Sequence, residues 1–125
     1  MRQWESHVTR ILIVDDQPAF RRQLSRLLVH AGLTVVGEAG DISEAECLVR
    51  KLKPDLAVVD VELPSINGLE GTSRLKAIAP QLRVILVSAY RDRAEVYRTA
   101  AREVAAEDFV AKDDLDMNVV QAWKP

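Results

Sequence analysis

Short, uninterrupted apolar runs alternate with longer amphipathic stretches along this chain, and that alternation limits its possible folds more than any other feature. Several of the runs are rich in valine and isoleucine and lack polar alternation, which is typical of strands covered on both faces of a parallel sheet. We therefore predict five strands, at Ile11–Val14, Thr34–Val36, Leu56–Val59, Arg83–Val87 and Phe109–Ala111.

The segments between these runs carry apolar residues at helical spacing. The first segment has Pro18 where a helix would begin and Gly32 where it would end. Ser43 and Glu46 have the spacing of a capping box for a second helix, which Pro54 would end. These patterns predict that a helix follows each of the first two strands.

Three more helices are expected further along the chain. Pro80 would stop the third, and the fourth would run from about Asp92, as its cap, to Val104. A short fifth helix would span Asp116 to Trp123. Strand and helix thus alternate five times, and right-handed crossovers place helices on both faces of the sheet. The predicted fold class is α/β, a doubly wound five-stranded parallel sheet with strand order 2-1-3-4-5.

Composition excludes several classes of protein. The chain has 125 residues, 48% hydrophobic and 29% charged, which is enough for one folded domain. With 17 Lys and Arg against 19 Asp and Glu, it lacks the basic stripe that direct nucleic-acid binding requires. Cys47 alone cannot form a disulfide framework, and the apolar runs are too short to cross a membrane. We expect a cytoplasmic protein with an N-terminal extension over residues 1–9 and one domain over residues 10–125, whose final helix is short.

Polar residues follow the carboxyl ends of four predicted strands. Asp15 and Asp16 follow the first, Asp60 the third, Ser88 the fourth and Lys112 the fifth. Functional sites of doubly wound sheets lie outside the carboxyl ends of the strands, where the strand order reverses. The predicted order therefore brings three carboxylates, one hydroxyl and one ammonium to a single edge.

Such a cluster of carboxylates needs a compensating cation. Two unit charges about 5 Å apart repel by roughly 3 kcal/mol at an effective dielectric constant of about 20. Lys112 can neutralise one charge, and an oxygen-only ligand set suits Mg²⁺. The same set meets the needs of phosphoryl transfer: Asp60 as nucleophile, with Lys112 and Ser88 on phosphoryl oxygens.

The ordered motifs ILIVDD, VVDVELPSING, ILVSA and FVAK resemble the receiver domain of two-component response regulators. The match runs from about Arg10 to Leu115 and implies a flavodoxin-like receiver fold. It also implies Mg²⁺-dependent transfer of a phosphoryl group to Asp60 from a sensor histidine kinase or a phosphotransfer protein. In this family the residue at Asp16 binds Mg²⁺ directly, the residue at Asp15 commonly acts through water, and the backbone carbonyl at Glu62 completes the ligands.

The resemblance also implies a switch. Phosphorylation would draw Ser88 towards the phosphoryl group and let Phe109, at the family's aromatic position, move inward; Tyr90 is a third candidate. The responding surface would be the face of the fourth helix, fifth strand and fifth helix, for an output domain or a homodimer. The stretches VVGEAGD and Lys112–Asp113 look most like the subfamily with a helix-turn-helix output domain.

Three departures from the family pattern are visible. Asp113 follows Lys112 where many receivers have proline, Ala105 and Asp108 stand where glycines are usual, and Ser88 replaces threonine. A receiver of this kind would catalyse only its own phosphorylation and dephosphorylation.

Three alternatives remain at this stage. A degenerate receiver would act as an interaction module without phosphorylation. A phosphatase with Asp60 as nucleophile would use Glu62 as acid or base, but no segment of the chain could form the enclosing cap. A flavin-binding module would need a phosphate loop after the first strand, where Asp15 and Asp16 would instead repel phosphate.

Overall fold

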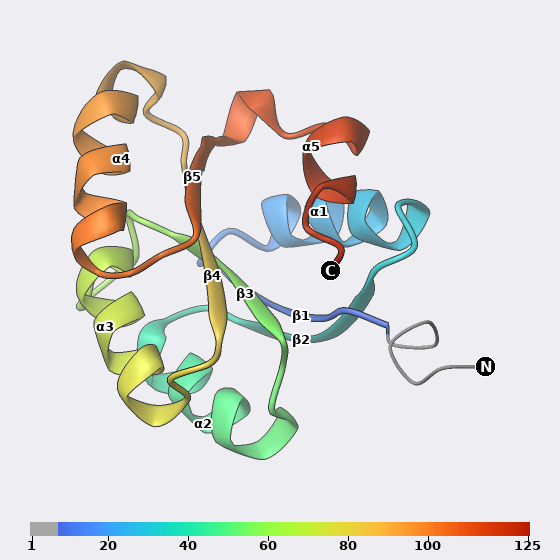
Figure 1. The fold of residues 1–125 in the computed structure, drawn as a ribbon, viewed down its shortest axis with the longest axis horizontal. Helices are drawn as coiled ribbons and strands as arrows, with labels where there is room; N and C mark the ends of the chain where they lie inside the picture. The colour runs from blue at the N-terminus through green and yellow to red at the C-terminus, as the bar shows by residue number, and fades with distance from the viewer. Residues whose placement is uncertain (1–7) are drawn as a thin grey trace.

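The structure is a computed structural model that describes residues 8–125. Most of the predicted N-terminal extension therefore lies outside the described residues. Strands and helices alternate throughout (Figure 1). The elements are β1 (Arg10–Val14), α1 (Pro18–His30), β2 (Thr34–Ala39), α2 (Ile42–Leu52), β3 (Leu56–Asp60), α3 (Gly68–Ile78), β4 (Arg83–Ser88), α4 (Ala94–Glu103), β5 (Asp108–Ala111) and α5 (Met117–Gln121).

Within residues 8–125 the strands form one parallel sheet of five, in the order β2-β1-β3-β4-β5. The predicted fold class and strand order are confirmed. Val14 pairs with Val59, and Asp60 pairs with Val87. This register brings the carboxyl ends of β1, β3 and β4 to the same edge of the sheet, which fixes where the residues after each strand lie.

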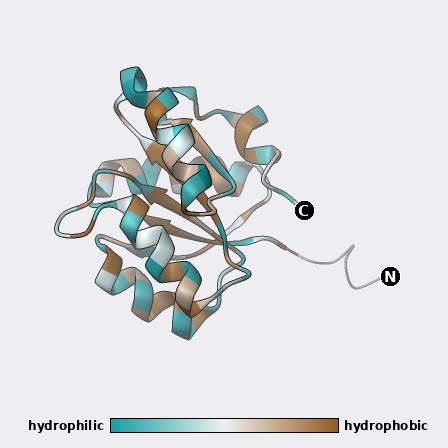
Figure 2. Cartoon of the chain, turned by 60° about the vertical axis from the view of Figure 1, so that its left-hand side comes forward, coloured by the Kyte–Doolittle hydropathy of each residue, from teal (hydrophilic) through white to brown (hydrophobic). Residues whose placement is uncertain are grey.

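Successive residues of each strand enter two different cores. Leu12, Val59 and Leu86 face α2, α3 and α4, whereas Ile11, Val58 and Ile85 face α1 and α5. The helices accordingly lie in two layers on either side of the sheet (Figure 1). Colouring by hydropathy shows apolar strands inside and helices with polar outer surfaces (Figure 2). Burial on both faces explains why the strands lack polar alternation.

Two predicted helix starts were wrong. The cap of α2 is Asp41, whose side chain accepts a hydrogen bond from the Glu44 amide at 2.8 Å, and the Glu44 carboxylate accepts one from the Gly40 amide at 3.0 Å. The capping box therefore lies two residues before the predicted pair, because Ser43 is already inside the helix. Asp92 lies in a 3₁₀ turn, Arg91–Arg93, and does not cap α4. The fifth helix was predicted to begin at Asp116, and this residue is the cap of α5, its side chain accepting a hydrogen bond from the Val119 amide at 2.9 Å.

None of the helices in residues 8–125 is long and apolar enough to cross a membrane.

Candidate functional site

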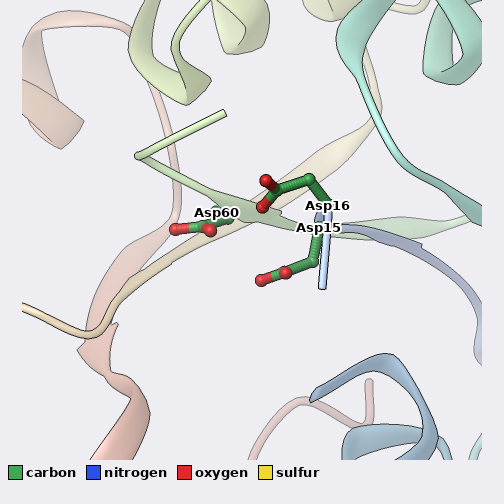
Figure 3. A group of neighbouring side chains, drawn as sticks. All are labelled: Asp15, Asp16 and Asp60. Carbon is green, nitrogen blue, oxygen red and sulfur yellow. The ribbon is translucent and has the colours of Figure 1, made fainter. Parts of the chain in front are cut away.

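Three carboxylates converge at the carboxyl edge of the sheet. Asp15 and Asp16 directly follow β1, and Asp60 is the last residue of β3. One carboxylate oxygen from each residue lies within 4.8 Å of the others (Figure 3). Asp15 is 0% and Asp60 4% exposed, while Asp16 is open to solvent. The sequence-based prediction that these residues meet is confirmed by this geometry.

The start of α1 orients Asp15. Its Oδ1 accepts a hydrogen bond from the Gln17 amide at 2.8 Å, and its carbonyl accepts one from the Arg21 guanidinium at 2.5 Å. Arg21 is itself held by Glu38 on β2 at 3.0 Å. These contacts leave Asp15 Oδ2 facing the other carboxylates.

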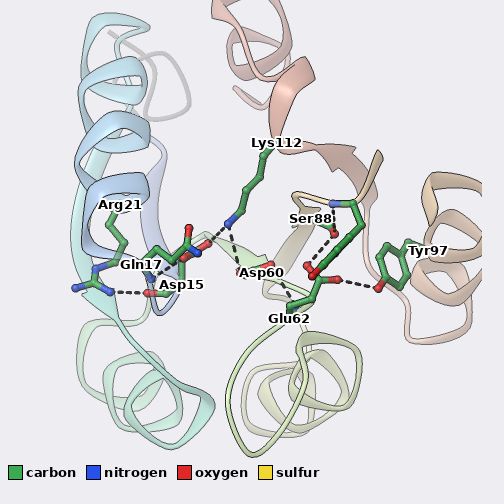
Figure 4. A network of polar contacts seen from close by, with 9 residues as sticks. Asp15, Gln17, Arg21, Asp60, Glu62, Ser88, Tyr97 and Lys112 are labelled. Carbon is green, nitrogen blue, oxygen red and sulfur yellow. Dashed lines mark hydrogen bonds and ion pairs between the residues drawn. The ribbon is translucent and has the colours of Figure 1, made fainter. Parts of the chain in front are cut away.

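Lys112 reaches the cluster from the turn that follows β5. Its Nζ lies 2.7 Å from Asp15 Oδ2 and 3.4 Å from Asp60 Oδ2 (Figure 4). The ammonium also lies over the Phe20 ring, 4.1 Å from its centroid. The shorter of the two contacts of Lys112 is with Asp15. Phe20 was not predicted as part of the site, because nothing in its helical spacing separates this contact from ordinary packing.

Burial and repulsion disfavour the charged form of Asp60. Removal from water, followed by the Asp15 charge, raises its pKa to about 7, although Lys112 and the Glu62 amide act in the opposite direction. Asp15 Oδ2 is buried and accepts no hydrogen bond of good geometry, since its contact with Lys112 is an ion pair only. The single positive charge of Lys112 cannot balance three neighbouring carboxylates, and an excess of carboxylate oxygens is the arrangement that a hard divalent cation fits.

The loop after β3 packs tightly under Asp60. The Glu62 amide donates to Asp60 Oδ1 at 3.1 Å, and the Gly68 amide donates to the Val61 carbonyl at 2.8 Å. A Cβ added to Gly68 would lie 2.1 Å from the Asp60 carbonyl oxygen, which no side chain can tolerate. Glycine at position 68 therefore allows α3 to begin directly beneath Asp60.

Ser88, at the end of β4, is bonded to Glu62. Its hydroxyl donates to Glu62 Oε1 at 2.8 Å and accepts from the Tyr90 amide at 3.0 Å. The other Glu62 oxygen accepts a hydrogen bond from the Tyr97 hydroxyl at 2.7 Å (Figure 4). The Glu62 side chain thus connects β4 to α4, whereas the resemblance to receiver domains implied a role only for its backbone carbonyl.

Tyr97 is a site residue that the sequence-based predictions missed. The signal was available, since Ala94, Tyr97, Ala101 and Val104 recur at helical spacing and all pack towards the core that includes Phe109. The Tyr97 and Phe109 ring centroids are 5.5 Å apart. Helical spacing places Tyr97 on the inner face of α4 but cannot reveal which acceptor its hydroxyl meets.

The other two aromatic candidates lie in contrasting environments. Phe109 is 2% exposed, so its ring is already buried in this structure, which lies at the end point of the expected inward movement. Tyr90 is 47% exposed, with the Arg93 guanidinium 4.5 Å from its ring centroid. A switching role for either residue stays a prediction.

Residues 11–123 match the family described as "Response regulator receiver domain". Protein CcdB of Bacillus subtilis is 34% identical over 115 residues, which are 92% of this chain and 94% of CcdB. Chemotaxis protein CheY of Thermotoga maritima is 34% identical over 90% of this chain and 92% of its own length. Other relatives are longer: the chain spans 30% of a protein-glutamate methylesterase/protein-glutamine glutaminase from Agrobacterium fabrum.

Solved structures give the same result. A two-component response regulator of the LuxR family from Aurantimonas sp. SI85-9A1 superimposes with a TM-score of 0.84 at 32% identity. The superposition covers 94% of this chain and 83% of that structure.

Proposed function

This chain belongs to the response regulator receiver domain family, and from that premise we propose that Asp60 is the residue on which it accepts a phosphoryl group. Receiver domains are the phosphoacceptor signalling domains of two-component systems. The observation that supports Asp60 is its position: a 4% exposed carboxylate at the end of β3, beside Asp15 and Asp16 and 3.4 Å from Lys112.

In the proposed reaction, a carboxylate oxygen of Asp60 attacks the phosphorus of a phosphohistidine on the donor protein. The P–N bond breaks and its electron pair returns to the imidazole, which takes up a proton, while Asp60 becomes an acyl phosphate. The reaction needs ionised Asp60, and the Lys112 ammonium and the Glu62 amide both favour that form. After the transfer, the Lys112 ammonium can form an ion pair with a phosphoryl oxygen.

Asp15, Asp16 and Asp60 would hold Mg²⁺, together with the backbone carbonyl of Glu62. When bound, the ion neutralises negative charge on the carboxylates and on the phosphoryl oxygens. The convergence of three carboxylates within 4.8 Å of one another, with one ammonium beside them, supports this assignment. The exposed side of the cluster at Asp16 leaves room for water ligands, which Mg²⁺ usually keeps.

The geometry favours a receiver over a phosphatase with Asp60 as nucleophile. Such an enzyme would need Glu62 to act as acid or base beside Asp60, but both oxygens of that carboxylate are bonded to Ser88 and Tyr97. We therefore propose no enzymatic activity beyond the chain's own phosphorylation and dephosphorylation.

Partners follow from the same proposal. The phosphoryl donor would be a histidine kinase or a phosphotransfer protein, and residues 10–125 would act as one receiver domain in the cytoplasm. The face of α4, β5 and α5 would contact an output domain or a second copy. The LuxR-family regulator among the similar structures supports an output domain of the helix-turn-helix class.

The direct test is incubation with Mg²⁺ and acetyl phosphate, followed by intact mass measurement. We expect one added phosphoryl group in the wild type and none in Asp60→Asn. Asp92→Asn is the matched control, because Asp92 is an exposed acid outside the cluster, and it should be labelled normally. An unmodified wild type, or labelling that survives Asp60→Asn, would contradict the assignment.

A further inference from the structure

The Glu62 carboxylate joins the end of β4 to α4. Ser88 at the end of β4 donates to one oxygen at 2.8 Å, and Tyr97 on α4 donates to the other at 2.7 Å (Figure 4). Hydrogen bonds to a charged acceptor are among the stronger ones in proteins. The loop that carries Glu62 also carries the amide that bonds Asp60 Oδ1, so the carboxylate is positioned from the same turn as the proposed phosphoacceptor.

Ser88 cannot serve Glu62 and a phosphoryl group at once. A serine hydroxyl has a single proton to donate, and Glu62 accepts it. The hydroxyl oxygen meanwhile accepts from the Tyr90 amide at 3.0 Å. A phosphoryl group on Asp60 presents acceptors only, so Ser88 can contact it as a donor only after its bond to Glu62 is broken.

Electrostatic repulsion also favours breaking the bond between Ser88 and Glu62. An acyl phosphate on Asp60 adds about −1.5 to −2 units of charge. Glu62 follows two residues later in a turn, and its carboxylate is half-buried, so the repulsion is only partly screened. The phosphoryl group therefore competes with Glu62 for the Ser88 hydroxyl proton and also repels the Glu62 carboxylate.

Release of Glu62 has a consequence in α4. The Tyr97 hydroxyl loses its acceptor, while its ring still packs on Phe109 with the ring centroids 5.5 Å apart. Phe109 is already buried, so we expect the release of Glu62 to move Tyr97 and α4.

We propose that the Glu62 side chain is a positioning residue that holds Ser88 and Tyr97 in the unphosphorylated arrangement and is displaced when Asp60 is phosphorylated. This inference rests on the proposed function of Asp60. The Glu62 carboxylate is then the link between the phosphoryl group and α4, and it sets how readily the phosphorylated arrangement forms.

The test compares the affinity for beryllofluoride, a phosphoryl mimic, in the presence of Mg²⁺. Glu62→Ala should bind it about tenfold more tightly than the wild type, because the competing charged hydrogen bond is gone. Glu95→Ala removes an exposed acid of α4, and its affinity should change by less than about twofold. A loss of structure could not tighten binding, so the direction of the change separates positioning from general destabilisation.

Backbone amide NMR gives the second readout. In Glu62→Ala without ligand, the amides of Ser88, Tyr90 and α4 should move towards their positions in the beryllofluoride-bound wild type. Tyr97→Phe keeps the bond between Ser88 and Glu62 but removes the second bond that displacement of Glu62 breaks, so its affinity should rise by less than that of Glu62→Ala, while the response of α4 to beryllofluoride shrinks.

Equal affinities in the wild type and Glu62→Ala, with unchanged ligand-free spectra, would overturn this role of Glu62 and leave the phosphoacceptor assignment intact. A wild type that neither binds beryllofluoride nor takes a phosphoryl group from acetyl phosphate would instead overturn the proposed function itself.

Discussion

Replacing Asp60 with asparagine should stabilise the metal-free protein at alkaline pH. Burial, and then the Asp15 charge, raises the pKa of Asp60 from 3.8 to about 7 in the folded protein. In the unfolded chain Asp60 loses its proton near the ordinary pKa of 3.8, so the folded state binds more protons than the unfolded state between about pH 4 and pH 7. The stability associated with protonated Asp60 is therefore complete below about pH 4 and is lost as the pH rises through about 7.

The size of the effect follows from that pKa difference. A rise of about three units corresponds to roughly 4 kcal/mol, at about 1.4 kcal/mol per unit. Asparagine has nearly the same shape and carries no charge. We expect Asp60→Asn to exceed the wild type by about 2–4 kcal/mol in unfolding free energy at pH 8, and to equal it near pH 4.

Urea unfolding at both pH values, with a chelator present, measures this difference. Asp92→Asn is again the control, because that exposed carboxylate should change stability by no more than about 0.5 kcal/mol. The reasoning fails if the wild type is as stable as Asp60→Asn at pH 8. It also fails if the advantage of the variant is the same at both pH values, because the cause would then not be ionisation.

Four further outcomes are expected. Mg²⁺ at about 100 times its Kd should raise the unfolding free energy by about 2.7 kcal/mol, and Asp16→Ala should lose most of that gain in thermal melts. Lys112→Ala should keep its Mg²⁺ affinity in a titration, yet beryllofluoride should shift amides only near Asp60 and no longer in α4. Gly68→Ala should cost about 3 kcal/mol or more in urea unfolding, because its Cβ would lie 2.1 Å from the Asp60 carbonyl oxygen. Ala105→Gly should add about 0.5–1 kcal/mol by the same measurement, because Ala105 has φ of 61°.

The elements that the sequence predicts best are those fixed by burial on both faces. Ile11, Leu56 and Val84 each begin an apolar run and are 0% exposed in the sheet, and no polar alternation competes with that pattern. The edge strand β2 is less buried and extends to Ala39, three residues beyond its predicted end, because Gly37 and Glu38 interrupt the apolar run but still pair with β1.

Helix starts were less predictable because two residues can compete for the same role. Asp41 and Ser43 are both good caps, and each has a glutamate three residues later. The loop that follows β2 ends early enough for Asp41 to cap α2, which places Ser43 in the first turn. The choice between Asp41 and Ser43 as the cap was therefore set by where β2 ends, which depends on its pairing in the sheet.

The site also contains residues that the sequence predicts and contacts that it does not. Asp15, Asp16, Asp60 and Lys112 were predictable because the backbone alone brings strand ends together. The bonds of Glu62 to Ser88 and Tyr97 depend on side-chain conformations and on the exact placement of α4 over β4. No spacing rule along the chain relates positions 62, 88 and 97.

Two of the departures from the family pattern, Ala105 and Asp108, lie in the turn before β5 and at its first residue. Ala105 adopts a positive φ of 61°, which explains why glycine is usual at this position, so alanine strains the turn. Asp108 is exposed, and its carboxylate accepts a hydrogen bond from the Phe109 amide at 2.8 Å, while the Phe109 ring points into the core. The added charge thus lies on the solvent side of β5, away from the contact between Phe109 and Tyr97. A change in switching would therefore have to come from Glu62, Ser88 and Tyr97, whose contacts connect the acidic cluster to α4.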